Sequence, residues 1–126
     1  MEDSGLKGRK ILIVEDDFSS RLYLNKLLEK SGAVLFNAAD GKEAFNMVMN
    51  NPELELVLMD IQLPVLDGYS CTRMLREAGK NLIIIAQTAY GLTGDKEKMM
   101  NSGFNDYLIK PISNLQLLEK LAIYLK

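Results

Sequence analysis

The sequence predicts a single α/β domain in which five parallel strands form a doubly wound sheet with helices on both faces. Its 126 residues suffice for one hydrophobic core and are too few for two. Hydrophobic residues make up 48% of the chain and charged residues 25%, which is a globular composition. Short apolar runs alternate along the chain with segments of helical spacing. This alternation is typical of parallel strands joined by right-handed helical crossovers.

Five short apolar runs are the predicted strands. Residues 11–14 and 56–59 are continuous aliphatic runs that end abruptly at acidic residues, as strands buried on both faces do when their carboxyl ends open into a polar site. The other three predicted strands are residues 33–38, 82–86 and 107–109. We expect residues 1–9 to form a flexible N-terminal lead-in and residues 10–126 to form the domain.

A helix is predicted after each strand. The first has leucines at near-helical spacing and ends at Ser31-Gly32, and the second follows a turn at Asp40-Gly41. Gly79 closes the third helix, and the fourth covers residues 95–101. Ser113 is the expected cap of the last helix.

Charge and residue usage exclude several classes of function. The 15 Lys and Arg residues nearly balance 17 Asp and Glu residues, so the chain lacks the basic surface expected for direct nucleic-acid binding. No apolar run is long enough for membrane insertion. A single cysteine excludes an internal disulfide and favours a cytoplasmic location. The chain has no histidine, so carboxylates, lysine and hydroxyls must carry any chemistry.

The strand ends bring a specific set of polar residues together. In open parallel sheets, the functional site lies outside the carboxyl ends of the strands. The residues at those ends are Glu15-Asp16-Asp17, Asp60, Thr88 and Lys110. The predicted topology therefore gathers several acids, one hydroxyl and one lysine in a single crevice.

This set of residues suits a phosphoryl group beside a hard cation. Clustered carboxylates repel one another unless a cation compensates, and ligands that are all oxygen favour Mg²⁺. Asp60 can form an aspartyl phosphate. Lys110 supplies a positive charge for a phosphoryl oxygen, and the Thr88 hydroxyl can donate to another. The residues alone therefore predict a Mg²⁺-dependent phosphorylation site.

From about Lys10 to the last helix, the chain resembles the receiver domains of two-component response regulators and hybrid sensor histidine kinases. The order and spacing of the motifs carry the resemblance, with 44 positions from Asp16 to Asp60 and 22 from Thr88 to Lys110. The matching stretches are residues 11–17, 58–64 and 67–69, Thr88-Ala89 and Lys110-Pro111. The resemblance implies a flavodoxin-like (βα)₅ fold with strand order 2-1-3-4-5.

The resemblance also implies a role for each site residue. Asp60 would be the phosphoacceptor, and Thr88 and Lys110 would contact the phosphoryl group. Thr88 and Tyr107 would form a conformational switch, Lys110-Pro111 a cis peptide bond, and Gln62 and Tyr90 would tune access of the hydrolytic water. The implied ligands of Mg²⁺, for which Mn²⁺ could substitute, are Glu15, Asp16, Asp60 and the backbone carbonyl of Gln62.

The implied function is that of a phosphoacceptor in a two-component phosphorelay. A histidine kinase or histidine phosphotransfer domain would donate the phosphoryl group. The domain would catalyse its own phosphorylation and slow autodephosphorylation without being a conventional enzyme. Phosphorylation would favour an active conformation, and the fourth helix, fifth strand and fifth helix would then bind an effector domain or protein. The motifs fit a stand-alone regulator and a receiver within a hybrid kinase equally.

Two rival functions remain open at the level of sequence. A small Mg²⁺-dependent aspartyl-phosphate phosphatase or phosphotransferase would carry a general acid two residues after its nucleophile, but this chain has Gln62 there. A flavin- or nucleotide-binding module would need a loop rich in Ser, Thr and Gly after the first strand. The acidic residues 15–17 occupy that place and repel phosphate without a cation.

Overall fold

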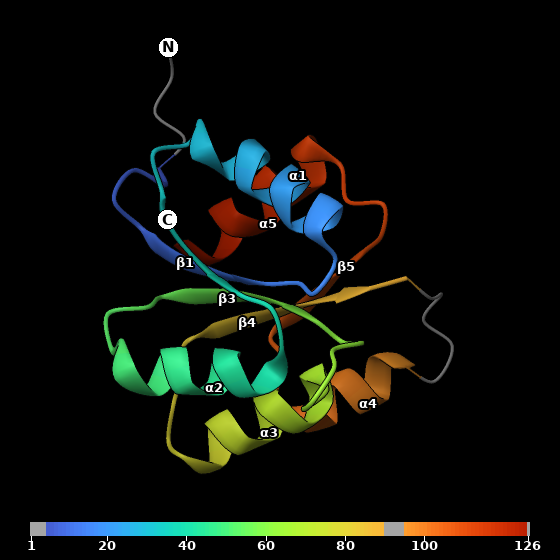
Figure 1. Cartoon of the computed structure of the whole chain (residues 1–126). Coiled ribbons are helices and arrows are strands. Elements are labelled where there is room, and N and C mark those ends of the chain that lie inside the picture. The colour runs from blue at the N-terminus through green and yellow to red at the C-terminus, as the bar shows by residue number, and fades with distance from the viewer. Residues whose placement is uncertain (1–4, 90–94, 126) are drawn as a thin grey trace.

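The structure is a computed structural model that describes residues 5–89 and 95–125. Strands and helices alternate throughout (Figure 1). In chain order they are β1 (Lys10–Val14), α1 (Phe18–Glu29), β2 (Val34–Ala38), α2 (Gly41–Asn50), β3 (Leu56–Asp60), α3 (Gly68–Glu77), β4 (Ile83–Thr88), α4 (Asp95–Ser102), β5 (Asp106–Ile109) and α5 (Asn114–Leu125). None of the described helices is long and apolar enough to cross a membrane.

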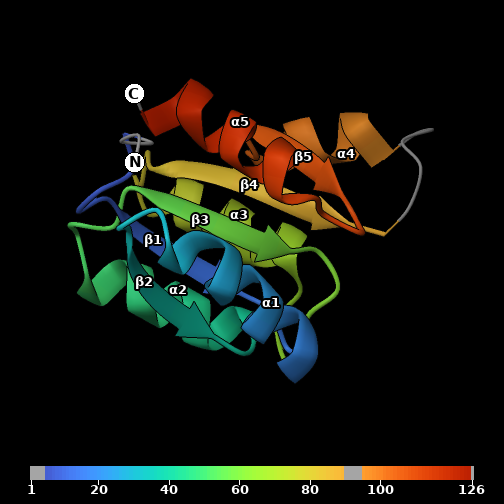
Figure 2. The ribbon, with the colours of Figure 1, turned by 90° about the horizontal axis from the view of Figure 1, so that it is seen from above.

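The five strands form one parallel sheet in the order β2-β1-β3-β4-β5. Helices α1 and α5 cover one face, and α2, α3 and α4 cover the other (Figures 1 and 2). In β1, Ile11 and Ile13 pack on the α1 and α5 side, whereas Leu12 and Val14 pack on the opposite side. Because both faces are covered, the central strand β3 is buried along its whole length. The predicted fold class and strand order are confirmed.

The helix starts are stabilised by side-chain caps. Asp17, Asp40 and Asp67 each accept a hydrogen bond from the backbone N–H three residues later, at the starts of α1, α2 and α3. The hydroxyl oxygen of Ser113 accepts a hydrogen bond from the Gln116 N–H in the first turn of α5, as expected for a cap. These caps set the points at which the chain leaves the sheet edge and turns into a helix.

The described part of the lead-in, residues 5–9, packs against the domain. Leu6 is buried in the core on the α1 and α5 side, and the Gly8 N–H donates to the Gly32 carbonyl. The Arg9 guanidinium donates to the backbone carbonyl of Leu125 at the end of α5. Residues 5–9 therefore contact the domain, and burial of the Leu6 side chain favours this packing.

Candidate functional site

Three carboxylates meet at the carboxyl ends of β1 and β3. Glu15 and Asp16 follow β1, and Asp60 ends β3. One carboxylate oxygen from each lies within 4.8 Å of the other two. Glu15 and Asp60 are buried, whereas Asp16 is exposed. The predicted acidic cluster therefore exists, with two buried members and one open to solvent.

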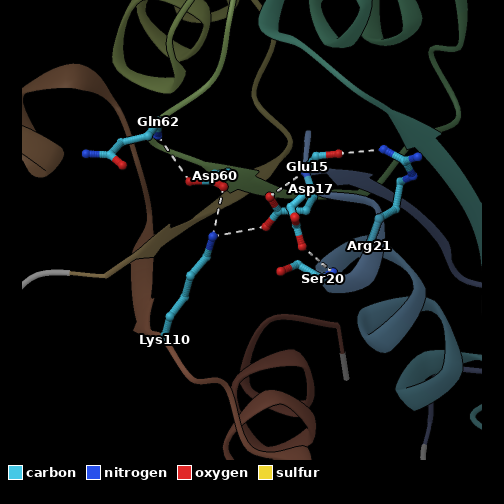
Figure 3. Close-up of polar contacts among 7 residues, drawn as sticks. All are labelled: Glu15, Asp17, Ser20, Arg21, Asp60, Gln62 and Lys110. Atoms are coloured by element: carbon cyan, nitrogen blue, oxygen red, sulfur yellow. Dashed lines mark hydrogen bonds and ion pairs between the residues drawn. The ribbon is translucent and has the colours of Figure 1, made fainter.

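Lys110 lies between the two buried carboxylates (Figure 3). Its Nζ atom is 2.8 Å from Oδ2 of Asp60 and 3.0 Å from Oε1 of Glu15. The peptide bond from Lys110 to Pro111 is cis. One ammonium group thus serves two carboxylates, which leaves an excess of negative charge at the site.

The backbone after β3 supports Asp60. The Gln62 N–H donates to Oδ1 of Asp60 at 3.1 Å, and the Gly68 N–H donates to the Ile61 carbonyl at 2.9 Å. A Cβ atom at Gly68 would lie 2.3 Å from the carbonyl oxygen of Asp60, so only glycine permits this close approach of α3 to the acidic residue. The start of α3 therefore fixes the position of Asp60.

The turn between β1 and α1 holds Glu15 in place. Oε2 of Glu15 accepts from the Asp17 N–H at 3.2 Å, and its backbone carbonyl accepts from the Arg21 guanidinium at 2.9 Å (Figure 3). Asp17 points away from the cluster toward Ser20 and caps α1. Of the three acids at the end of β1, Asp17 therefore caps a helix and is not a member of the carboxylate cluster. Arg21, which holds the backbone of Glu15, was not predicted from the sequence. Its position in the first turn of a helix that follows an acidic strand end could have indicated this contact.

Burial and charge shift the titration of this cluster. Burial raises the pKa of Glu15, and the nearby charge of Asp60 raises it further, while the hydrogen bond from Lys110 opposes this shift. For Lys110, burial lowers the pKa, but the hydrogen bonds to Asp60 and Glu15 outweigh it and the net pKa is raised. The site therefore keeps its lysine charged and places a free-energy penalty on ionised Glu15.

The donor set fits a hard divalent cation. All three candidate ligand groups are carboxylates, and no described histidine or cysteine stands among them. Asp16 is open to solvent, so an ion held there could keep several of its waters, as Mg²⁺ does. The excess negative charge left by Lys110 gives such an ion a physical reason to bind.

The remaining predicted residues lie around this cluster or outside the described structure. Thr88 ends β4 and, with Asp16, Asp60 and Lys110, lines a cavity of about 410 Å³. Gln62 lines the same cavity and has an exposed side chain. Tyr107 is half-buried on β5 and packs against the core on the α2, α3 and α4 side. Tyr90 lies outside the described residues.

The sequence reasoning also missed Gln87. This residue lies on β4 between Ala86 and Thr88, is completely buried, and lines the cavity that contains Asp60 and Lys110. A polar residue directly after the aliphatic run 82–86 was the available signal, because a buried amide needs hydrogen-bond partners.

Comparison with known proteins identifies the family. The family model for the response regulator receiver domain matches residues 11–122. The transcriptional regulatory protein CusR of Escherichia coli strain K12 is 35% identical over 117 residues, which cover 93% of this chain and 51% of CusR. The sensor histidine kinase GacS of Pseudomonas protegens is 36% identical over 116 residues, which cover 88% of this chain and 12% of GacS. The chain thus spans about half of CusR and a small part of GacS.

Solved structures agree with this assignment. The receiver domain of a sensor histidine kinase from Pseudomonas aeruginosa PAO1, with a magnesium ion coordinated in its active-site cleft, has a TM-score of 0.85 and 38% identity, covering 94% of this chain and 98% of that one. The receiver domain of Ssk1 from Saccharomyces cerevisiae was crystallised with the histidine phosphotransfer protein Ypd1. It has a TM-score of 0.89 and 32% identity, and the match covers 94% of this chain and 90% of the Ssk1 domain. The chain belongs to the response regulator receiver family and is a receiver domain of two-component signal transduction.

Proposed function

We propose that Asp60 is the phosphoacceptor of this receiver domain and that Glu15 and Asp16 hold the Mg²⁺ ion on which its phosphorylation depends. The observation that carries the proposal is the contact of Lys110 Nζ with both Asp60 and Glu15, at 2.8 and 3.0 Å, beside the solvent-open carboxylate of Asp16. A cation held by Glu15 and Asp16 would, together with Lys110, supply the positive charge that a phosphoryl group on Asp60 requires. Mn²⁺ offers the same preference for oxygen ligands and is the expected substitute.

The reaction that this arrangement supports is transfer of a phosphoryl group from a phosphohistidine. An oxygen of the Asp60 carboxylate forms a bond to phosphorus while the bond from phosphorus to the donor imidazole nitrogen breaks. The imidazole leaves with that electron pair and takes up a proton. Bound Mg²⁺ would neutralise charge on the phosphoryl oxygens and on the acidic residues, with the Gln62 carbonyl as a further ligand. Lys110 then pairs with a phosphoryl oxygen in place of the carboxylate that it contacts here.

The switch that follows is proposed to involve Thr88 and Tyr107. Thr88 is buried at the end of β4 and lines the cavity that contains Asp60, which supports a role for its hydroxyl as a donor to the phosphoryl group. Tyr107 lies on the neighbouring strand, where Ala86 is its register partner. A shift of Thr88 toward the phosphoryl group would make room for Tyr107 to turn inward, which favours the active conformation.

The proposed output surface is formed by α4, β5 and α5. Ile109 on β5 and Ile123 on α5 are 42% and 68% exposed, and both line a surface groove beside Tyr107 and Lys120. Exposed apolar residues next to the switch residue suit an effector domain or effector protein. The proposed phosphodonor is a histidine kinase or histidine phosphotransfer domain in the cytoplasm, by analogy with the relatives described above.

A phosphatase or phosphotransferase activity on small substrates has less support. Such an enzyme needs a general acid two residues after its nucleophile, and the neutral amide of Gln62 cannot act as a general acid or base near neutral pH. We propose instead that the domain catalyses its own phosphorylation and slow autodephosphorylation. Gln62 and Tyr90 would tune the second reaction by controlling the approach of water.

Intact-protein mass spectrometry tests this function. After incubation with acetyl phosphate and Mg²⁺, the protein should gain one phosphoryl group of about 80 Da, because the Asp60 carboxylate displaces acetate. The adduct should disappear without Mg²⁺ and in Asp60→Asn. A full adduct in Asp60→Asn, or one that forms equally well with a chelator present, would contradict the proposed acceptor and its metal.

Thr88→Ala separates phosphorylation from the switch. This variant should still form the adduct, because Asp60 and Lys110 remain in place, but it should lose most of the gain in partner affinity that phosphorylation produces. Titration of a fluorescent effector peptide with phosphorylated and unphosphorylated protein measures that gain. An unchanged gain in Thr88→Ala would remove Thr88 from the switch.

A further inference from the structure

The side chain of Gln87 is buried without using its hydrogen-bonding groups. It is 0% exposed, and neither Oε1 nor Nε2 has a hydrogen-bond partner among the described residues. Burying an amide in this way carries a free-energy penalty, because both atoms lose their hydrogen bonds to water. Such a group in a folded domain calls for a physical explanation.

The register of the sheet places this amide next to the phosphorylation site. Gln87 is the register partner of Asp60 on one side and of Leu108 on the other. Side chains alternate along β4, and Ile85 packs on the α1 and α5 face, so Gln87 points to that same face. Gln87 is therefore flanked on this face by Asp60 and by the strand that leads into Lys110.

Two cavities meet at Gln87. One is the cavity that contains Asp60, and the other, of about 330 Å³, lies between α1 and the segment after β5 and is walled by Tyr23, Leu24 and Ile112. Glu15 and Lys110 line both cavities together with Gln87. The unpartnered amide is thus beside the two groups that must rearrange when Asp60 is phosphorylated.

The hydrogen bonds of Lys110 and Glu15 show what this amide can do. An ammonium group has three N–H donors, and Lys110 uses two of them on Asp60 and Glu15. We take the turn of the lysine to a phosphoryl oxygen to draw its ammonium group away from Glu15 as well as from Asp60, so that Oε1 of Glu15 needs another donor. Gln87 offers one neutral acceptor for the ammonium group and two N–H donors for a carboxylate.

We propose that Gln87 is a positioning residue for the phosphorylated state, in which its Oε1 atom accepts a hydrogen bond from Lys110 Nζ and its Nε2 atom donates to Oε1 of Glu15. This inference rests on the proposed function of Asp60 and deepens it. The buried amide is unpaired before phosphorylation and paired afterwards. Gln87 therefore destabilises the unphosphorylated domain and stabilises the phosphorylated one.

The test uses Gln87→Met, which keeps the length of the side chain and removes both polar groups. Beryllofluoride serves as the phosphoryl mimic in saturating Mg²⁺, with its Kd measured by calorimetry. We expect the Kd to rise about a hundredfold, about tenfold for each of the two hydrogen bonds to charged groups that are lost, while the melting temperature of the free protein does not fall. Gln87→Leu provides a second variant with the same expectation.

Thr72→Val is the matched control. The Thr72 hydroxyl is also fully buried without a partner among the described residues, but it lies on α3 and does not line either cavity. This variant should leave the Kd for beryllofluoride unchanged. If Gln87→Met also leaves the Kd unchanged while the wild-type protein binds beryllofluoride, the inference about Gln87 is wrong and the function of Asp60 stands. If the wild-type protein neither binds beryllofluoride nor forms the phosphoryl adduct, both proposals fail.

A spectroscopic measurement reports on Lys110 directly. The ¹⁵Nζ resonance of Lys110 should differ between wild-type protein and Gln87→Met when beryllofluoride is bound, and should match when it is not. A merely structural role of Gln87 would shift the resonance equally in both states, and that result would overturn the inference.

Discussion

Two ion pairs lie at opposite ends of the sheet and differ in burial and charge balance. At the carboxyl ends, Lys110 contacts two carboxylates whose side chains are only 2% and 7% exposed. At the amino ends, Arg9 pairs with Glu55, and these side chains are 38% and 33% exposed. The second pair is balanced and links the start of β1 to the segment before β3. At the carboxyl ends, one lysine faces two buried carboxylates, so negative charge exceeds positive charge. This imbalance provides a reason to bind a cation and a phosphoryl group.

Two glycines, one at each end of the sheet, also differ in the space around their Cα atoms. Gly68, beside Asp60, has no room for a Cβ atom, because that atom would lie 2.3 Å from the Asp60 carbonyl oxygen. Gly79 follows α3 and precedes β4, and a Cβ atom added there would have no heavy atom within 4 Å beyond its chain neighbours. Its backbone adopts a φ of +82°. Glycine is therefore required by close packing at the site, and only by backbone conformation at the other end.

Removing the lysine should give the largest effect. Lys110→Met leaves Asp60 and Glu15 facing each other without a counter-charge, and we expect a loss of about 3 kcal/mol in the free energy of unfolding without Mg²⁺. Arg9→Met should cost about 1 kcal/mol, because its ion pair with Glu55 is half-exposed and the guanidinium also donates to the Leu125 carbonyl. Urea unfolding measures both values, and added Mg²⁺ should reduce the first loss only. Equal losses in the two variants would contradict the contrast between the two ends.

Adding a methyl group at the two glycines should give the next largest effect. Gly68→Ala forces α3 away from Asp60, and we expect a loss of about 2 kcal/mol together with slower formation of the phosphoryl adduct. Gly79→Ala should cost about 1 kcal/mol through its positive φ and leave adduct formation unchanged. Unfolding in urea and the rate of adduct formation separate the two outcomes. Wild-type phosphorylation in Gly68→Ala would show that the close approach of α3 is not needed to place Asp60.

The smallest expected effect is a pH dependence from Glu15. Burial raises its pKa above the ordinary value of 4.5, so the folded protein holds this proton more tightly than the unfolded chain does. Its contribution to stability is therefore greatest below 4.5 and is lost as the pH rises through the raised pKa. In Glu15→Gln, this decline should be absent from urea unfolding measured across a pH series without Mg²⁺. A decline of the same size in the variant would assign it to another group.

The site residues that lie at the ends of strands could be predicted from the sequence. The aliphatic runs before Glu15 and Asp60 and the strand that precedes Lys110 were sufficient to predict that these residues meet, because parallel strands place their carboxyl ends at one edge. The sequence could not show that Glu15 and Asp60 are buried while Asp16 is exposed. That distinction depends on how closely α3 and the β1–α1 turn approach the sheet.

The features that could not be predicted depend on contacts between distant segments. Leu6 is buried because the chain before β1 folds onto the core beside α5, and no local pattern signals this packing. The unpaired amide of Gln87 becomes visible only when β3 and β5 are placed on either side of it. In both cases the deciding neighbours are far away in the sequence, so propensity and periodicity carry no information about them.

The most direct test of the central claim is to locate the phosphoryl group chemically. The protein is phosphorylated with acetyl phosphate and Mg²⁺, treated with borohydride, which reduces an acyl phosphate to an alcohol, and digested for tandem mass spectrometry. The account predicts homoserine in place of Asp60, with Glu15, Asp16 and Asp17 unchanged. Reduction at any of those three residues with Asp60 intact would contradict it, because the acid that Lys110 contacts at 2.8 Å would then not be the acceptor.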